Sequence, residues 1–389
     1  MSRTPDVAVI GAGMVGAATA ARLAEAGLGV VLVDQAEPAA GASGGNHSLV
    51  LWCDAEPGPS LELTRRAWDE FAGEAASLGG VGFRPIHTLG LIRDGEDPSA
   101  ALGPCAHLTA AGFVTELVDI PAVRELEPYL DTAGFCGAVL QQQAAVNPFA
   151  FTLAWADRAR AAGAELMTQT RVTGIERHGG QVTALRTTTG RLAAGLYVLA
   201  AGAWTRPLAL TAGVDLPQWH IIGEACVTEA LPPLVHGLVG VIGAERVAFE
   251  GRLAALAGEG AGMRLTEFGV IQSPDGNLII GQVSHGGPGF DVTVRPSSLR
   301  DMAAELLRRY PRAAGASLIR AWARPVPFTP DHQPIIGCPA EPTNLFIASG
   351  LKSTIIITPL LSKLIAASIL GGGPGPLAAF SPRRFEEVA

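Results

Sequence analysis

The sequence predicts an α/β protein with two domains, of which the first is discontinuous along the chain. Its 389 residues exceed what one compact core usually holds. The chain opens with the pattern of a strand, a glycine-rich turn, a helix and a second strand, and it closes with a strand, a turn and a helix. Between them lie strand-like runs separated by turn signals, which indicate an antiparallel sheet. We therefore expect the two ends to build one domain and the middle to cover its binding face.

The opening segment, residues 6–34, predicts a βαβ unit. Val7–Ile10 and Val30–Val33 are short apolar runs typical of buried strands, and Met14–Ala26 is an alanine-rich helix that Gly27 closes. The pattern GxGxxG stands between the first strand and the helix.

This glycine turn predicts a dinucleotide site. Gly11 permits the tight turn, Gly13 lets the backbone approach a pyrophosphate, and Gly16 lets the helix pack closely on the strand. Free amides at the helix N-terminus then face the anion. Asp34 ends the second strand, where an acid hydrogen-bonds a ribose hydroxyl and disfavours a 2′-phosphate. The motif alone does not separate NAD from FAD.

The rest of the chain predicts elements of both kinds. The apolar run Ile355–Leu370 contains Pro359 and Lys363 and is short for a membrane span, so we interpret it as a buried helix after a strand. Helices are expected over Leu61–Leu78, Phe149–Ala162, Leu299–Tyr310 and Pro359–Leu370. Strands are expected over Gly90–Arg93, Val114–Asp119, Glu165–Gln169, Val172–Arg177, Gln181–Thr187, Leu196–Ala201, Glu224–Glu229, Val239–Ile242, Phe268–Gln272, Leu278–Gln282 and Leu345–Ala348.

Composition narrows the class of protein. Charged residues make up 16% and hydrophobic residues 48% of the chain, which favours a large buried interior over disorder. The net charge of -8 and the lack of a basic stripe argue against a nucleic-acid partner. The five cysteines are scattered without a CxxC pair, so we expect reduced thiols in a cytoplasmic protein and no metal site.

Several segments, in order along nearly the whole chain, resemble the FAD-dependent oxidoreductases of the D-amino-acid oxidase superfamily. The branch of glycine oxidase, sarcosine oxidase and D-amino-acid dehydrogenase is the most similar. The segments are VIGAGMVGAATAARLAEAG, the loop GASGGN at 41–46, ELEP at 125–128, VNP at 146–148, LAAGAW at 199–204, ARP at 323–325, TPDHQPIIG at 329–337 and the terminal glycine turn with its helix.

The resemblance implies a Rossmann-type FAD-binding domain over residues 1–85, 145–215 and 321–389, and an antiparallel-sheet substrate domain over 86–144 and 216–320. Some relatives hold FAD through a cysteine near the TPD segment, but residues 324–331 contain none, so we expect non-covalent FAD. The residues expected at the cofactor are Gly11, Gly13, Met14, Val15, Gly16, Asp34, Gln35, Ser43, Gly45, Asn46, Val172, Ala201, Gly202, Trp204, Gly337, Gly350, Leu351, Lys352, Ser353 and Thr354.

The family's chemistry moves a hydride from the substrate α-carbon to flavin N5, so we expect a carboxylate anchor and a cation near the flavin. Arg324 stands where the glycine-oxidase branch binds the substrate carboxylate, and its planar fork suits that task. Lys352 is the candidate cation, in a turn that lacks the family's usual histidine. His47 follows the flavin loop and is a candidate titrating group. Candidates for the pocket wall are Trp219, His220 and Glu224.

Three functions stay open at this point. The first is oxidation of the C–N bond of a small amino or imino acid to an imine; a D-amino acid, glycine or sarcosine, proline or hydroxyproline, and an opine are the candidate substrates. The second is oxidation of a 2-hydroxy acid, which needs His47 or His220 as a base. The third is a flavin subunit that has no turnover or depends on a partner.

The same partners are expected for these candidate functions. Oxygen, a quinone or an electron-transfer protein would accept the electrons, and the chain would form a homo- or hetero-oligomer. We expect it in the cytoplasm, with attachment to the inner membrane through a partner as the alternative.

Overall fold

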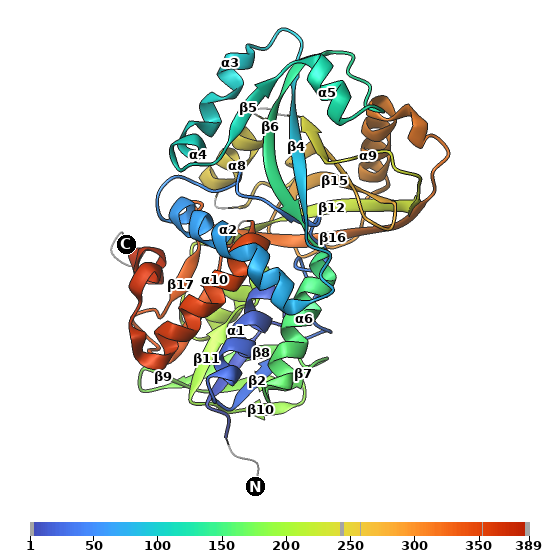
Figure 1. Ribbon diagram of the computed structural model, residues 1–389. Coiled ribbons are helices and arrows are strands. Elements are labelled where there is room, and N and C mark those ends of the chain that lie inside the picture. Colours follow the sequence, from blue (N-terminus) through green and yellow to red (C-terminus); the bar gives the residue numbers. More distant parts are fainter. Residues whose placement is uncertain (1–3, 242–244, 257, 352, 386–389) are drawn as a thin grey trace.

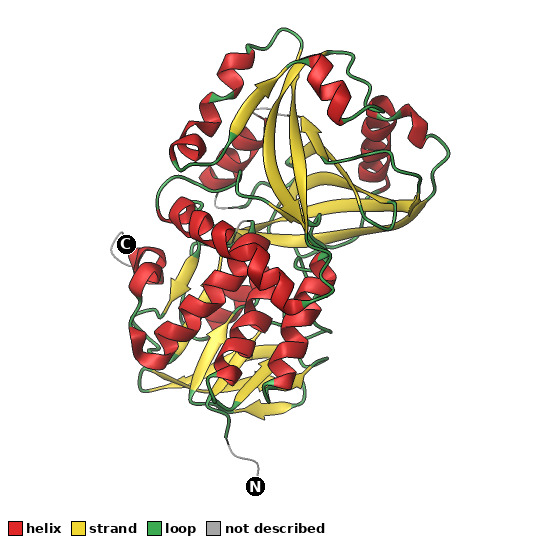
Figure 2. Ribbon diagram, in the orientation of Figure 1, coloured by secondary structure: helices red, strands yellow, loops and turns green. Residues whose placement is uncertain are grey.

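The computed structural model describes residues 4–241, 245–256, 258–351 and 353–385. Within these residues the strands form a six-stranded, a three-stranded and a nine-stranded sheet. The molecule has two lobes, with the six-stranded sheet in the lower one and the nine-stranded sheet in the upper one (Figures 1 and 2). Both ends of the chain and its middle part, coloured blue, red and green, meet in the lower lobe, as expected for a discontinuous domain (Figure 1).

The six-stranded sheet, called the base sheet here, has the strand order β17-β18-β11-β1-β2-β7. Its strands are parallel except for β17, which pairs antiparallel with β18. This is the Rossmann-type arrangement that the opening βαβ unit predicts. The strands are β1 (Val7–Ile10), β2 (Val30–Val33), β7 (Glu165–Met167), β11 (Leu196–Leu199), β17 (Ile335–Gly337) and β18 (Leu345–Ser349).

Both faces of the base sheet are covered. Val7 and Val9 point into a core shared with four helices, whereas Ala8 and Ile10 point into a core on the other face. The helices are α1 (Met14–Glu25), α2 (Pro59–Leu78), α6 (Pro148–Ala161) and α10 (Thr354–Ala367). The other face carries α7 (Thr205–Thr211) and the three-stranded sheet of β8 (Val172–His178), β9 (Gln181–Thr187) and β10 (Gly190–Leu192).

Helix α10 is a core helix, as its sequence predicts. Among the described residues, Thr354–Gly372 is the one helical stretch long and apolar enough to cross a membrane. More than half of it is buried inside the protein, where it packs on α1 and α2. The helix begins at Thr354, ahead of the predicted Pro359, because Ile355, Ile356 and Ile357 are all buried and extend the apolar core by a turn.

The nine-stranded sheet, called the roof sheet here, lies above the carboxyl ends of the base sheet (Figure 1). Its pairs are antiparallel except for β13 with β4. In sheet order its strands are β16 (Leu318–Phe328), β12 (Trp219–Ala230), β15 (Asn277–Gly286), β14 (Arg264–Gln272), β13 (Leu238–Val241), β4 (Arg84–Arg93), β6 (Phe135–Ala145) and β3 (Leu49–Val50), with β5 (Thr115–Val118) on β6. Its helices are α3 (Pro98–Ala101), α4 (Ala106–Ala110), α5 (Ile120–Leu126), α8 (Glu245–Ala255) and α9 (Pro296–Arg309).

The ELEP segment supplies a buried carboxylate to the upper lobe. Glu127 is fully buried and accepts hydrogen bonds from the backbone N–H groups of His236 and Gly237 and from the Tyr310 hydroxyl. Its Oε1 also lies 2.9 Å from Nε2 of His87. Burying a carboxylate is costly unless its oxygens are paired, and this network pairs both. The segment is therefore a structural centre of the upper lobe.

Strands β6 and β16 were not among the expected elements. The three glutamines 141–143 break the apolar pattern by which a strand is predicted, so β6 was missed. Gln141 and Gln143 are nevertheless buried, and Gln143 Oε1 accepts a hydrogen bond from the backbone N–H of Trp52. Strand β16 continues in the roof sheet to Phe328, past the predicted domain boundary at residue 321. The cause is its pairing with β12 along almost its whole length.

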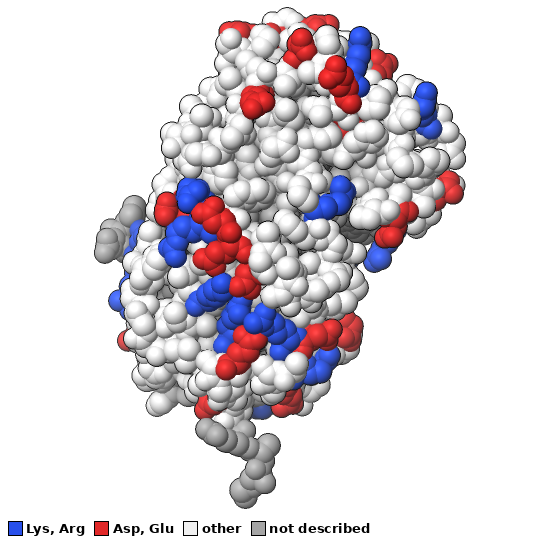
Figure 3. All heavy atoms as spheres, viewed as in Figure 1, with Lys and Arg blue, Asp and Glu red and all other residues white. Residues whose placement is uncertain are grey.

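Charges of both signs are interspersed over the helices that cover the base sheet on the face seen in Figure 3. Several form ion pairs between helices: Arg22 of α1 and Lys363 of α10 both bind Glu74 of α2. Burial raises the pKa of the Glu74 carboxyl, but these two cations outweigh it and leave the pKa below the usual range. The pairs tie the helices of the lower lobe together.

Candidate active site

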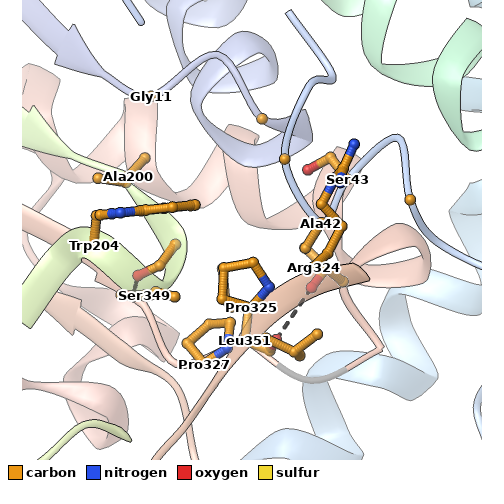
Figure 4. A pocket seen from close by; sticks show the side chains of 18 of the residues that line it. Gly11, Ala42, Ser43, Ala200, Trp204, Arg324, Pro325, Pro327, Ser349 and Leu351 are labelled. Atoms are coloured by element: carbon orange, nitrogen blue, oxygen red, sulfur yellow. Dashed lines mark hydrogen bonds between the residues drawn. The ribbon is translucent and has the colours of Figure 1, made fainter. Parts of the chain in front are cut away.

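A cavity of about 1200 Å³ runs from the carboxyl ends of β1, β2, β11 and β18 to the underside of the roof sheet (Figure 4). Ligands of open α/β sheets bind at this edge of the strands. The volume exceeds the usual range for a pocket that holds one small molecule. The cavity therefore has room for a dinucleotide together with a substrate.

The glycine turn forms one wall, and its glycines are required by geometry. Gly11 has a φ of +106°, and a Cβ on it would come within 2.4 Å of the Ala200 carbonyl oxygen. A Cβ on Gly13 would lie 2.9 Å from the Ser43 Oγ. That hydroxyl accepts a hydrogen bond from the Met14 N–H, which joins the GASGGN loop to the start of α1. The turn thus leaves backbone exposed to the cavity, as anion binding at a helix N-terminus requires.

Asp34 lies beside this turn and is held by backbone donors. Its two carboxylate oxygens accept from the N–H groups of Ala12, at 2.7 Å, and Ala36, at 2.9 Å. Burial raises the pKa of the Asp34 carboxyl, and the two N–H donors oppose that effect. The carboxylate lines the cavity where β2 ends, the position expected for binding an adenosine ribose.

The C-terminal turn closes the cavity on another side. Gly350 has a φ of +68°, and the Ser353 hydroxyl donates to Asp54 Oδ2 at 2.8 Å. Ser349 Oγ donates to Gln218 Oε1 at 2.6 Å and lies 3.1 Å from the Gly202 carbonyl oxygen, which links this turn to the AAGAW segment. Lys352, the candidate cation, lies outside the described residues.

The roof sheet presents residues of β16 and β12 to the cavity. Along β16 these are Trp322 and the whole run from Arg324 to Phe328, which includes Pro325 and Pro327 (Figure 4). On β12 the lining residues are Ile221, Gly223 and Ala225. The candidate wall residues Trp219, His220 and Glu224 do not line it. Glu224 has the opposite parity on β12, where it pairs with Arg295 at 2.7 Å on the far face of the sheet.

Arg324 is well placed to bind an anion. It lines the cavity across from Trp204 (Figure 4). Its Nη1 donates to the Ala323 carbonyl at 2.7 Å, and its Nε is buried with no hydrogen-bond partner among the described residues. Burial, and then the charge of Arg320, lower the pKa of the guanidinium. Since a buried unpaired donor is costly, this side chain calls for an acceptor from a ligand.

His47 lines the same end of the cavity. Its ring packs against Gly281, where a Cβ would come within 2.3 Å of Nε2. Nε2 is buried and makes no hydrogen bond within the described part of the chain. Burial, and then the charge of Arg246, lower the pKa of His47 to about 4. The imidazole is therefore neutral near pH 7.

Most of the predicted cofactor residues meet at this cavity, and two do not. Gly16 packs inside the turn, where a Cβ would lie 1.9 Å from the Gly11 carbonyl oxygen, so it shapes the turn without facing a ligand. Gly337 lies on β17 and packs against Pro382, away from the cavity. Those that line it are Gly11, Gly13, Met14, Val15, Asp34, Gln35, Ser43, Gly45, Asn46, Val172, Ala201, Gly202, Trp204, Gly350, Leu351, Ser353 and Thr354, along with Arg324 and His47.

Sequence reasoning missed the parts of the site that come from the roof sheet and its connections. Arg246 of α8 and Gln282 of β15 line the cavity, as do Asp54 and Phe290. Phe290 stacks on Trp204 with ring centroids 5.2 Å apart and on His220 at 4.2 Å, which brings the loop after β15 against the lower lobe. No motif signals these residues, because tertiary structure alone brings them to the cavity.

Fold and cavity together define a dinucleotide-binding oxidoreductase whose second domain covers the reacting end of its cofactor. The glycine turn, Asp34 and the volume fit FAD, and no cysteine lines the cavity within the described residues, in keeping with non-covalent binding. Residues 6–368 match the family described as FAD dependent oxidoreductase, to which this chain belongs. It is thus an FAD enzyme of the D-amino-acid oxidase superfamily.

Known relatives cover nearly the whole chain. Glycine oxidase from Pseudomonas aeruginosa is 30% identical over 387 aligned residues, covering 95% of each chain. Hydrogen cyanide synthase subunit HcnC from the same species is 26% identical, covering 99% of this chain and 97% of that one. Among solved structures, glycine oxidase from Geobacillus kaustophilus has a TM-score of 0.85 at 23% identity and covers 98% of this chain and 99% of its own.

Proposed function

We propose that this protein oxidises the C–N bond of a small amino or imino acid to an imine. The observation that carries the proposal is Arg324, whose buried Nε lacks a partner among the described residues and whose side chain lines the cavity that fits FAD. A guanidinium pairs well with a carboxylate in a partly buried site. The names of the relatives support the same class, since they include glycine oxidase and 4-methylaminobutanoate oxidase.

The chain's own residues have distinct tasks in this proposal. Arg324 binds the substrate carboxylate and thereby fixes which substrate atom faces the cofactor. The roof sheet and Phe290 exclude water from above. FAD, when bound, supplies the hydride acceptor. An amine that binds neutral needs no strong base, because its lone pair assists hydride departure.

The histidines favour C–N over C–O oxidation. A 2-hydroxy acid needs a base to take its hydroxyl proton. His220 is not available for that task, because its Nε2 lies 2.9 Å from the Gly289 carbonyl oxygen and its ring stacks on Phe290. His47 is a weak base, since its pKa is lowered to about 4. The fold alone does not decide between the two, because a glycerophosphate oxidase shares it with a TM-score of 0.78.

The test is anaerobic bleaching of the flavin absorbance in the FAD-loaded protein. The panel comprises D- and L-amino acids, N-methyl amino acids, prolines, opines and 2-hydroxy acids. We expect bleaching by one class of amine and not by its hydroxy-acid counterpart. Bleaching by hydroxy acids alone would contradict the proposal. A yellow protein that nothing bleaches would favour a subunit that depends on a partner.

The electron acceptor is a second part of the proposal. We propose oxygen, a quinone or a partner protein in this role, and admitting air after anaerobic bleaching separates oxygen from the other two. The relationship to a hydrogen cyanide synthase subunit supports looking for a hetero-oligomer. A cytoplasmic location is proposed as well, with membrane attachment through a partner as its alternative.

A further inference from the structure

One glutamine of the roof sheet lines the cavity with its carbonyl oxygen unpaired. Gln282, on β15, is half-buried. Its Nε2 donates to the Ser284 Oγ at 2.8 Å, and Ser284 is itself buried. Its Oε1 accepts no hydrogen bond from any residue that the structure describes. The amide is therefore held by its nitrogen and offers its oxygen as an acceptor to a ligand.

An irregularity in β15 turns this side chain toward the cavity. Leu278, Ile280 and Val283 point into the core on the far face of the roof sheet. The regular alternation of a strand would send residue 282 the same way as 278 and 280. Register shifts against both β12 and β14 leave Gln282 without a partner on either strand and pass the core position to Val283. Bulges re-aim side chains beside active sites in this way, so the sheet itself places Gln282 at the cavity.

Gln282 and Arg324 reach the cavity from opposite sides of one glycine. Gly223 on β12 pairs in register with Arg324 on β16, and a Cβ on Gly223 would lie 3.8 Å from Gln282 Oε1. Paired residues of adjacent strands hold their Cβ atoms about 5 Å apart, which puts Oε1 within about 9 Å of the Arg324 Cβ. Arg324 Nη1 donates to the Ala323 carbonyl, so the guanidinium stays on the β16 side of this gap. Because Gly223 has no side chain, the space between the amide oxygen and the guanidinium is open to a ligand.

The two groups match the two polar groups of an amino acid. A guanidinium binds a carboxylate, whereas an amide oxygen accepts from an amine N–H. Gln282 is uncharged, and the His47 imidazole that packs on the neighbouring Gly281 is neutral near pH 7. This acceptor thus binds the amine without favouring its protonated form, which has no lone pair to assist the oxidation.

We propose that Gln282 Oε1 accepts a hydrogen bond from the substrate amine while Arg324 binds the substrate carboxylate, so that the preferred substrate is a primary or secondary amine and not a tertiary one. The inference rests on the proposed function, in which Arg324 is the carboxylate anchor. As the α-carbon gives a hydride to the bound flavin, the nitrogen lone pair forms the C=N bond and the nitrogen becomes positively charged. Its N–H is then a stronger donor, so the bond to Gln282 is stronger in the transition state than in the bound substrate.

The test compares two ligands that differ only in this donor, on the FAD-loaded full chain. Pyrrole-2-carboxylate carries a ring N–H beside its carboxylate, and 2-furoate carries an oxygen at the same place. Their dissociation constants are read from the perturbation of the visible flavin spectrum, without turnover. We expect pyrrole-2-carboxylate to bind the wild-type protein at least about fivefold more tightly, because one hydrogen bond contributes that much. Equal affinity would overturn the proposal.

Gln282→Leu removes the acceptor and nearly keeps the size of the side chain. We expect it to bring the ratio of the two dissociation constants to about one. Gln142→Leu, at an exposed glutamine on β6 of the same sheet, is the matched control and keeps the wild-type ratio. A wild-type ratio in Gln282→Leu would overturn the proposal. If that variant fails to fold, the comparison in the wild-type protein still decides.

A second measurement separates the chemical step from binding. In Gln282→Leu we expect the limiting rate of anaerobic bleaching by the best amine of the panel to fall about tenfold, with a smaller rise in its half-saturating concentration. An unchanged limiting rate would overturn the proposal, as would equal bleaching of the wild-type protein by the tertiary, N-methylated form of that amine. Discrimination between the two ligands without bleaching by any amine would support this site and contradict the proposed function. Bleaching by amines without discrimination would do the reverse.

Discussion

The two ends of the cavity are built from different parts of the polypeptide. At the cofactor end the surface is largely backbone, supplied by Gly11, Gly13 and the GASGGN loop, and a single Cβ would collide with it. At the substrate end the surface is made of side chains, among them Arg324, Arg246 and Gln282, which come from separate strands and a helix. A substitution should therefore affect cofactor binding through shape at the first end and substrate choice through charge at the second.

The largest expected effect tests the backbone at the cofactor end. Gly11→Ala combines a φ of +106° with an approach of 2.4 Å to the Ala200 carbonyl, so we expect a loss of about 4 kcal/mol in unfolding free energy and little bound FAD. Gly27→Ala is the control, since it has a φ of +88° with nothing within 4 Å, and it should cost about 1 kcal/mol. Urea unfolding and flavin absorbance per chain measure both. Equal losses would show that strain alone matters at Gly11.

The next effect tests charge at the substrate end. We expect Arg324→Gln to lower kcat/KM at least about 100-fold while FAD content stays unchanged, because two charge-assisted hydrogen bonds to the carboxylate are lost. Arg320→Gln, on the exposed part of the same strand, should stay within about threefold of wild type. Steady-state kinetics with the best substrate of the panel measures this. A variant with nearly full activity would remove Arg324 as the carboxylate anchor.

A third prediction concerns the pH dependence of stability. The pKa of His47 is lowered to about 4, whereas an unfolded histidine has a pKa of about 6.5. The unfolded chain thus binds the proton more readily, and stability is lost as the pH falls from 6.5 to 4, by at most about 3 kcal/mol.

His47→Gln removes this proton and should lose less stability than wild type between pH 7 and pH 4.5. Urea midpoints of the apoprotein at the two pH values provide the measurement. His178→Gln is the control, because His178 is exposed at the end of β8. The same pH dependence in wild type and His47→Gln would mean that His47 titrates freely.

The smallest expected effect tests the hydrogen bond that connects the cofactor end of the cavity to the substrate end. Trp322 Nε1 on β16 donates to the Gly45 carbonyl at 2.8 Å and so connects the roof sheet to the GASGGN loop. Trp322→Phe removes this bond and should weaken FAD binding by about 1 kcal/mol, or roughly fivefold in Kd. Ultrafiltration of free FAD measures the change. The control is Trp68→Phe on α2, away from the cavity, which should leave the Kd for FAD unchanged. An equal rise in Kd in both variants would show that the effect comes from a general loss of stability.

The sequence predicts the cofactor end well because its determinants are local. Gly11, Gly13, Asp34 and Ser43 lie within a short stretch, and each is constrained by the strand or helix beside it. The terminal turn is predictable in the same way, although Gly337 packs against Pro382 and misses the cavity.

The substrate end is harder to predict, since its residues meet through sheet pairing. Arg324 was found by resemblance, whereas Gln282 and Arg246 carry no local signal. Gln282 reaches the cavity through the register of β15 with β12 and β14, and Arg246 reaches it through the packing of α8 beside β14. The alternation of side chains along β12 also decides which residues reach the pocket: Gly223 and Ala225 face the cavity, and Glu224 between them does not. One residue of uncertainty in a strand therefore reverses which side chains line the pocket.

Two of the six tryptophans, Trp204 and Trp322, line the cavity. Indole fluorescence overlaps the absorption band of flavins, so a flavin bound in this cavity would take up excitation energy from both indoles. Trp204 also stacks on Phe290, a residue of the loop that covers the cavity, and its emission responds to any movement of that loop. The unlabelled protein consequently carries its own fluorescent reporter, from which the arrival of the cofactor can be timed.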